Sequence, residues 1–207
     1  MGIERELAYL ITEAYSQYSR NKNGRDFVLA DGWLNIGNFF ADHVPWGFVA
    51  VKSDVMVVSI RGTDAWSDWL IDGEIVPNTL GIHKGFYELF TKLNGQIQNI
   101  LWHQFNPRLF KLYFTGHSAG APIAVQSAHD SGLPCQVITF ASPMFVTDDC
   151  SKFNTLEHTR IYNPLDKVPK LPIFPDYVHI GKPLPTSEFG NDPISEHSIN
   201  NYMECFS

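Results

Sequence analysis

Ser118 is the side chain in this sequence whose surroundings best suit a chemical role. It is the centre of a Gly-x-Ser-x-Gly pattern, flanked two residues away by Gly116 and Gly120. The apolar run 109–114 precedes the pattern and the run 121–128 follows it, which predicts a strand, a tight turn and a helix. Glycines without Cβ atoms allow a reversal that leaves the serine exposed, and a helix start aims backbone N–H groups at any negative charge developing there. The pattern predicts a serine nucleophile.

A serine hydroxyl needs a neighbouring base to take its proton, and an acid that orients this base. In chains with this turn the order is serine, acid, histidine, and three histidines follow Ser118 by more than a helix length. His158 abuts a predicted strand and His179 lies inside one, where a histidine is more often an ordinary packed or surface residue. His197 lies in a loop before the last segment, where catalytic groups of open α/β sheets are found. We therefore select His197 as the base and interpret His117 as structural.

Asp166 is our candidate for the acid. It follows a short predicted strand through a proline-stiffened stretch, which places its carboxylate at the carboxyl end of that strand. Asp148 and Asp149 also follow a predicted strand and are the main rivals. Two further loop residues, Asp176 and Asp192, are more typical of solvated charges.

The hydrophobic pattern predicts the elements that must position these groups. After residue 86 strands and helices alternate, which is typical of a largely parallel sheet with helices on its faces. A chain of 207 residues, 44% of them hydrophobic, can bury one substantial core. We find no linker or repeat, and therefore expect one α/β domain over residues 1–207. The predicted helices cover 3–20, 86–101 and 121–128, and the predicted strands cover 46–51 and 55–60 as a hairpin, 109–114, 135–140, 159–162 and, at an edge, 177–180.

Composition excludes several classes of protein. The net charge of −7 and the absence of a basic tract argue against nucleic acid as a partner. Cys135, Cys150 and Cys205 are odd in number and lack CxxC spacing, so neither a disulfide framework nor a zinc site is expected, and the chemistry requires no cofactor or metal. We see no signal peptide and no run of about 18 apolar residues that could span a membrane. We expect a soluble protein, cytoplasmic by default or released by a route without a signal.

Several short segments occur in an order and spacing that extend well beyond the serine motif. They are Ser59-Ile60-Arg61-Gly62-Thr63, Asp68-Trp69 with Asp72, His83-Lys84-Gly85-Phe86, residues 115–120, Thr139-Phe140-Ala141-Ser142-Pro143, residues 162–169, and His197 with Tyr202. Together they resemble the class 3 lipase family, the fungal-type lipases of the α/β-hydrolase superfamily. The resemblance implies an α/β-hydrolase fold, lipase or esterase activity, and a triad of Ser118, Asp166 and His197. It also implies that Thr63 and the backbone N–H of Ala119 supply an oxyanion hole.

The role of Thr63 has a physical basis, but the residues alone leave two interpretations open. The tetrahedral intermediate of ester hydrolysis carries a full charge on one oxygen, and each preorganised donor near it contributes about 3 kcal/mol. Thr63 offers both a backbone N–H and a hydroxyl at the end of a predicted strand. It could equally cap the segment that begins at Asp64. The resemblance favours the oxyanion role.

The sequence also departs from the family, and the departures concern the substrate. Ala119 stands where the family usually carries leucine, and the segment after Phe140 lacks the usual arginine and Gly-Asn pair. The expected reaction is hydrolysis of a lipid or other carboxylic ester, without triacylglycerol specificity. Alternatives are a phospholipase, thioesterase or acyltransferase with the same triad, or an inactive hydrolase-like binding protein. The apolar stripe in 65–82 packs on the core or, alternatively, forms a mobile lid that contacts a lipid interface.

Overall fold

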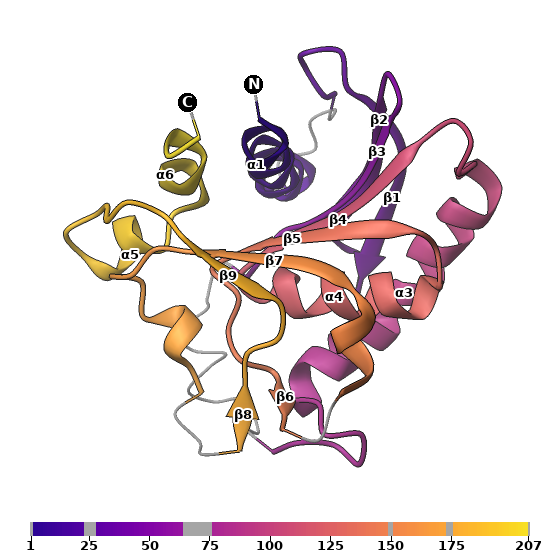
Figure 1. Ribbon diagram of the computed structural model, residues 1–207. Coiled ribbons are helices and arrows are strands. Elements are labelled where there is room, and N and C mark those ends of the chain that lie inside the picture. Colours follow the sequence, from indigo (N-terminus) through magenta and orange to yellow (C-terminus); the bar gives the residue numbers. More distant parts are fainter. Residues whose placement is uncertain (1, 23–27, 64–75, 149–150, 173–175, 207) are drawn as a thin grey trace.

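The computed structural model describes residues 2–22, 28–63, 76–148, 151–172 and 176–206. Most of the segment expected as core or lid, residues 65–75, lies outside the described residues, as do Asp149 and Cys150. A seven-stranded sheet lies between two helical layers, with α1 and α6 on one face and α3 and α4 on the other (Figure 1). The strand order is β1-β2-β3-β4-β5-β7-β9.

The strands confirm the largely parallel sheet predicted from the sequence. β1 and β2 pair antiparallel, as do β2 and β3, and the remaining pairs from β3 to β9 are parallel. The sheet strands are β1 (Leu34–Ala41), β2 (Val44–Lys52), β3 (Val55–Ile60), β4 (Lys111–His117), β5 (Cys135–Phe140), β7 (Glu157–Tyr162) and β9 (Lys182–Pro185). The hairpin of β2 and β3 was predicted, and β5 has the predicted bounds. β4 begins two residues later than predicted, because the N–H groups of Leu109 and Phe110 bond to the carbonyl of Asn106 in a turn.

The helices match the predicted amphipathic segments and extend beyond them. They are α1 (Ile3–Lys22), α3 (Lys84–Gln104) and α4 (Gly120–Ser131), followed near the C-terminus by α5 (Pro193–Glu196) and α6 (Ile199–Glu204). Two 3-10 turns, η1 (Ser151–Thr155) and η2 (Val168–Lys170), complete the set. α4 ends at Gly132, whose φ of +61° is a left-handed conformation that glycine adopts without a steric penalty.

The prediction that residues 177–180 form an edge strand of the main sheet is wrong. Only β8 (Tyr177–Val178) forms there, and it pairs with β6 (Val146–Thr147) in a separate two-stranded sheet. One edge of the main sheet is β9, and its prolines are the reason that the sequence pattern did not predict a strand there. An edge strand tolerates Pro183 and Pro185 because it bonds to a neighbour, β7, on one side.

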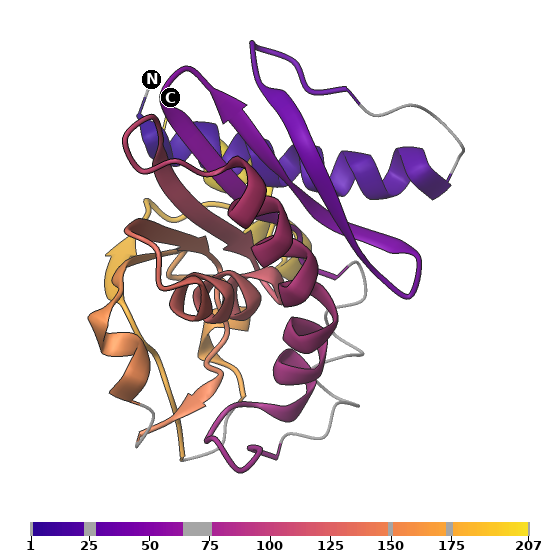
Figure 2. The ribbon, with the colours of Figure 1, turned by 90° about the vertical axis from the view of Figure 1, so that its right-hand side faces the viewer.

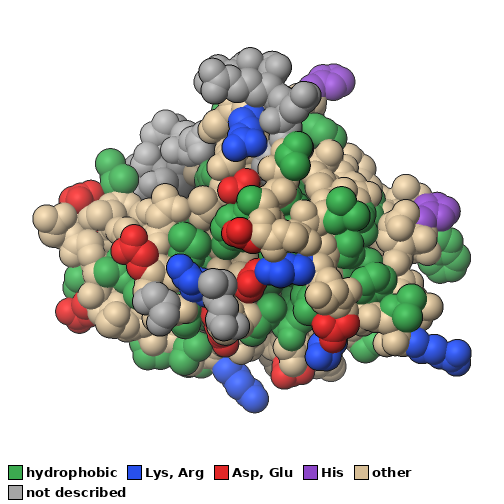
Figure 3. Space-filling view, turned by 90° about the horizontal axis from the view of Figure 1, so that it is seen from above, with side chains coloured by type: hydrophobic (Ala, Val, Ile, Leu, Met, Phe, Trp, Pro, Cys, Tyr) green, Lys and Arg blue, Asp and Glu red, His purple; other side chains and the backbone are tan. Residues whose placement is uncertain are grey.

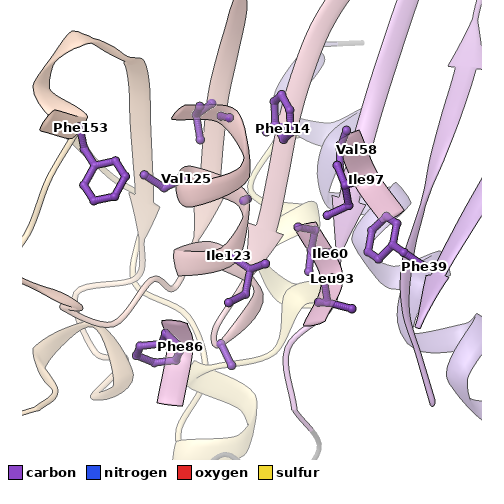
Figure 4. Packing of buried hydrophobic residues seen from close by; sticks show 14 of the residues in the cluster. Phe39, Val58, Ile60, Phe86, Leu93, Ile97, Phe114, Ile123, Val125 and Phe153 are labelled. Carbon is purple, nitrogen blue, oxygen red and sulfur yellow. The ribbon is translucent and has the colours of Figure 1, made fainter. Parts of the chain in front are cut away.

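Each face of the sheet carries its own hydrophobic core. One lies between the sheet and helices α3 and α4, where Phe39, Ile60, Phe86, Ile97 and Ile123 are among the buried side chains (Figure 4). The other core lies beneath α1 and α6, and the apolar stripe of α1 is fully buried in it. The two termini lie near each other on the α1 face (Figure 2). Burial on both faces holds the strands firmly, so their carboxyl ends are rigid positions for functional groups.

Candidate active site

Ser118 stands at the tight turn between β4 and α4, as the sequence predicts. Its φ of +53° is left-handed, a conformation that costs a non-glycine residue about 1–2 kcal/mol. The turn is held by hydrogen bonds of 3.0 Å from Ser118 N to Phe140 O and from Ala121 N to Ser118 O. A Cβ built on Gly116 would overlap the backbone of Gly120, so this position needs glycine.

Asp166 and His197 form a buried hydrogen-bonded pair. Nδ1 of His197 lies 2.8 Å from Oδ2 of Asp166, and both side chains are at least nine-tenths buried. Because a carboxylate only accepts, Nδ1 carries the proton and donates it to this bond, which leaves the Nε2 lone pair as the basic site. Of the histidines compared above, His197 is the one with a carboxylate contact among the described residues.

Two further groups orient the Asp166 carboxylate. Val168 N donates to Oδ1 at 2.9 Å, and the Tyr202 hydroxyl donates to Oδ2 at 3.0 Å. Burial, and then the charge of Asp166, raise the pKa of Tyr202, so this phenol stays protonated and can only be the donor. The same hydroxyl oxygen accepts the backbone N–H of Asn163 at 2.8 Å. Tyr202 belongs to the family-like segments noted in the sequence, five residues after His197, but its spacing did not indicate that it would bond to Asp166.

Asn163 connects the loop that carries Asp166 to the loop that carries His197. Its side chain is fully buried, and its Nδ2 donates to the carbonyl oxygen of Glu196 at 3.1 Å, directly before His197. Its Oδ1 accepts the backbone N–H of Leu165 at 3.1 Å, beside Asp166. One side chain therefore fixes the relative position of both loops.

His117 contacts the base loop and the first helix. Burial, and then the proximity of His197, lower its pKa well below the usual value, so the ring is neutral. Its Nε2 lies 2.9 Å from the carbonyl oxygen of His197, which can only accept, so the proton is on Nε2. Nδ1 must then accept the Tyr15 hydroxyl at 2.9 Å, and Tyr15 in turn accepts Gly62 N–H at 2.9 Å. This network connects α1, the β3 end, the serine turn and the base loop.

Thr63 and Ala119, the residues predicted for an oxyanion hole, line the same cavity of about 220 Å³, together with Trp46 and Leu89. Gly62, the residue before Thr63, lies directly against the serine turn, because a Cβ on Gly62 would come within 2.9 Å of the Ser118 Cβ. The carbonyl oxygens of Ile60 and Arg61 also lie against this turn, because a Cβ on Gly120 would come within 2.6 Å of both.

Arg61 holds this segment in place. Its guanidinium lies between the rings of Tyr18 and Trp46, at 4.1 and 4.4 Å from their centroids. Its Nε donates to Pro45 O at 2.9 Å and its Nη1 donates to Gly62 O at 2.6 Å. Since the Gly62 carbonyl belongs to the peptide that carries the Thr63 N–H, Arg61 also fixes the direction of that N–H.

The rival residues have other partners. Nε2 of His158 lies 2.9 Å from Thr139 Oγ1, and Nε2 of His179 lies 2.6 Å from Pro169 O. Burial lowers the pKa of His158 to about 3 and that of His179 to about 4, so both are neutral near pH 7. Asp192 caps α5 by accepting from the backbone of its first turn. Asp148 is exposed.

A larger cavity of about 740 Å³ lies on the α1 side of His197 and Thr63, and it meets the smaller cavity at Thr63. Within the described ranges no three His, Cys, Asp or Glu side chains are grouped as a metal site would require. Cys135 and Cys205 are free thiols. Among the same residues, no helix combines the length and the apolar character needed to cross a bilayer.

Solved structures similar to this chain include fungal lipases. The Rhizomucor miehei lipase in its propeptide complex superposes with a TM-score of 0.73 at 20% identity, over 87% of this chain and 67% of that one. Lip2 lipase from Yarrowia lipolytica gives a TM-score of 0.68 at 16% identity, over 89% of this chain and 77% of that one. At such identities the likeness establishes the fold, which is that of an α/β-hydrolase.

The sequence comparison names the family. Residues 57–175, more than half of the chain, match the family described as Lipase (class 3). The chain therefore belongs to the class 3 lipases, which are carboxylic ester hydrolases, and the resemblance noted from the motifs is confirmed. A relative in Arabidopsis thaliana, described as phospholipase A1-Igamma3, chloroplastic, is 24% identical over 70% of this chain. The chain spans only 40% of the length of that plant protein.

Proposed function

We propose that the protein is a serine ester hydrolase that cleaves lipid esters through an acyl-enzyme on Ser118. The observation that carries the proposal is the buried 2.8 Å hydrogen bond between Asp166 and His197, in a loop whose carbonyl oxygen bonds to the residue next to Ser118. This pair supports a base of fixed tautomer in a loop that is held against the residue preceding Ser118. These are the groups that acyl transfer needs.

In the first half of the reaction, Ser118 Oγ forms a bond to the ester carbonyl carbon, and its proton passes to Nε2 of His197. The imidazolium that results is stabilised by Asp166, which stays ionised. The intermediate then breaks its bond to the alcohol oxygen, which takes the proton from Nε2. The products of this half are the free alcohol and an acyl-enzyme.

In the second half, water takes the place of the alcohol. His197 removes a proton from the water as its oxygen attacks the acyl carbon, and then returns that proton to Ser118 Oγ. The carboxylic acid leaves and the enzyme is regenerated. In both halves the oxyanion accepts hydrogen bonds from Thr63 and from the Ala119 N–H, an assignment supported by the cavity that both residues line.

A chain-length series of p-nitrophenyl esters tests the proposal. We expect hydrolysis by the natural chain, with a preferred acyl length, and a loss of kcat of at least about 10³-fold in Ser118→Ala. The matched control is Ser127→Ala, which removes another buried serine hydroxyl, on α4, and which we expect to keep its activity. If Ser118→Ala and Ser127→Ala hydrolyse the esters equally well, the proposal fails. Thioester and alcohol-acceptor assays separate thioesterase and acyltransferase activity from hydrolysis.

A further inference from the structure

The larger cavity has a hydroxyl-rich wall formed by one face of α1. Ser16 follows Thr12 by four residues, and Ser19 and Arg20 follow Ser16 by three and four. The four residues therefore share one side of the helix, and all of them line the cavity. The face of α1 on the sheet side is apolar and fully buried. This face of α1 therefore presents polar side chains to a ligand in the cavity.

The opposite wall comes from the C-terminal segment, which lies beside α1 on the same face of the sheet (Figure 1). Ser198 and Asn200 contribute polar groups there, and Ile194, which is 79% exposed, stands at the margin. A hydrogen bond of 3.2 Å from Thr12 Oγ1 to Asn200 Oδ1 joins the two walls. His197 and Thr63 line the same cavity, so it is continuous with the reaction centre.

The position of His197 decides which part of an ester enters this cavity. The base must return its proton to the leaving alcohol oxygen, so the alcohol lies on the His197 side of the serine. The cavity of about 740 Å³ has His197 in its wall, whereas the smaller cavity lies on the Ala119 side and contains Trp46 and Leu89. The alcohol portion therefore occupies the hydroxyl-lined cavity. Its volume is within the range of about 300–1,000 Å³ that is usual for small-molecule sites.

The charges of the lining favour a phosphate over a neutral sugar. Arg20 is the one lysine or arginine among the described lining residues, and none of them is an aspartate or glutamate. Guanidinium and hydroxyl groups donate to phosphate oxygens, and a guanidinium forms a stronger, charge-assisted hydrogen bond with a phosphate than with a neutral sugar hydroxyl. Glu13, on the same helix, does not line the cavity. Burial raises the pKa of Glu13, and the nearby charge of Arg20 lowers it.

The cavity is lined by residues of α1 and of the C-terminal segment, on the α1 face of the molecule. There the described acidic and basic side chains are mixed among hydrophobic ones (Figure 3). With a net charge of −7, the chain as a whole does not attract anions. Selection of an anionic group must therefore be local, at Arg20 and the hydroxyls around it.

We propose that this α1 cavity binds the glycerophosphate portion of a phospholipid, with Arg20 and the serine hydroxyls of α1 on the phosphate. This inference rests on the proposed ester hydrolase function. It assigns Arg20 as a residue that determines head-group specificity and makes the leaving product a lysophospholipid.

The first test compares dihexanoyl-phosphatidylcholine with p-nitrophenyl butyrate. We expect Arg20→Gln to lower kcat/KM for the phospholipid about 10- to 100-fold more than for the nitrophenyl ester, the usual effect of a lost charge-assisted hydrogen bond. Arg20→Lys should restore part of this difference. The control Arg108→Gln removes an equal charge from an exposed loop before β4 and should leave both values unchanged. An equal effect of Arg20→Gln on both substrates would overturn the inference.

The second test measures binding without turnover. Calorimetry of the Ser118→Ala protein should detect binding of glycerophosphocholine, and the Ser118→Ala, Arg20→Gln protein should bind it at least about 10-fold more weakly. Galactosylglycerol is the neutral comparison ligand, and binding of that ligand in preference to glycerophosphocholine would contradict the inference. If the protein hydrolyses nitrophenyl esters but Arg20→Gln has no specific effect in either test, the head-group assignment is wrong and the proposed hydrolase function still stands. A natural chain that hydrolyses no ester would refute the proposed function itself.

Discussion

His117 donates its Nε2–H to the backbone carbonyl of His197 across 2.9 Å, and so the residue before the candidate nucleophile holds the loop of the candidate base. The two rings also lie close together, with centroids 4.6 Å apart. The other ring nitrogen of His117 is tied through Tyr15 to Gly62, beside the proposed oxyanion residue. A neutral histidine thus positions three parts of the site.

Tyr15→Phe tests this network. The substitution removes the acceptor of the Gly62 N–H and the donor to His117 Nδ1, leaving two partly buried polar groups without their partner. We expect the free energy of unfolding to fall by about 1–3 kcal/mol and kcat to fall more than KM changes. Urea unfolding and steady-state kinetics measure the two effects. Unchanged stability together with unchanged kcat would show that the network does not position the site.

Asp166→Asn tests the orientation of the base. An amide can donate to Nδ1 and so stabilise the wrong tautomer of His197, and we expect kcat to fall by about 10⁴-fold with little change in KM. Asp148→Asn makes the same chemical change at an exposed position and should keep full activity. Comparable activity losses in these two variants would contradict the assignment of the acid.

Ser118→Gly and Ser118→Ala should differ in stability although both lack the hydroxyl. The φ of +53° strains alanine but not glycine, so we expect the glycine variant to be more stable by about 1 kcal/mol. Thermal or urea unfolding of the two proteins gives the difference. Greater stability of the alanine variant would mean that the turn is not strained in solution.

The buried histidines predict acid sensitivity. Burial lowers the pKa of His83 to about 4, of His158 to about 3 and of His179 to about 4, and that of His117 well below its usual value. Between these values and about 6.5 the unfolded chain binds more protons than the folded one, so their stabilisation is complete above about pH 6.5 and is lost as the pH falls. Each such histidine adds up to about 1.4 kcal/mol per pH unit to the slope of the free energy of unfolding against pH.

Urea unfolding from pH 7 to pH 4 measures this slope. His158→Gln should reduce the slope of unfolding free energy against pH by the contribution of one proton, independently of its effect on stability at pH 7. A free energy of unfolding that stays constant or rises as the pH falls over this range would contradict the prediction.

The predictable parts of the site were those encoded by local pattern. The serine turn needs only two glycines between a strand and a helix, and Asp166 and His197 were selected as polar residues in loops at strand ends. The network around His117 was not predictable, because Tyr15 lies 102 residues away along the chain and its helical spacing groups it with the apolar face of α1. No local sequence pattern indicates that the Tyr15 hydroxyl bonds to the imidazole of a residue so distant along the chain.

The two edge strands escaped prediction for a related reason. β1 contains Gly37 and two asparagines, and its pairing with β2 has irregular register, so the alternation of a regular strand is lost. β9 is half proline and exposed throughout. Edge strands are determined by a neighbour's unpaired backbone more than by their own side chains, and that neighbour is distant in sequence.

The most direct measurement of the central claim is peptide mapping by mass spectrometry after reaction with a fluorophosphonate, which modifies activated serine hydroxyls. We expect one rapid adduct on Ser118, much slower labelling in Asp166→Asn, and unchanged labelling in Ser127→Ala. A folded protein that forms no adduct, or forms its adduct on a serine other than Ser118, would contradict the claim that Ser118, His197 and Asp166 act together.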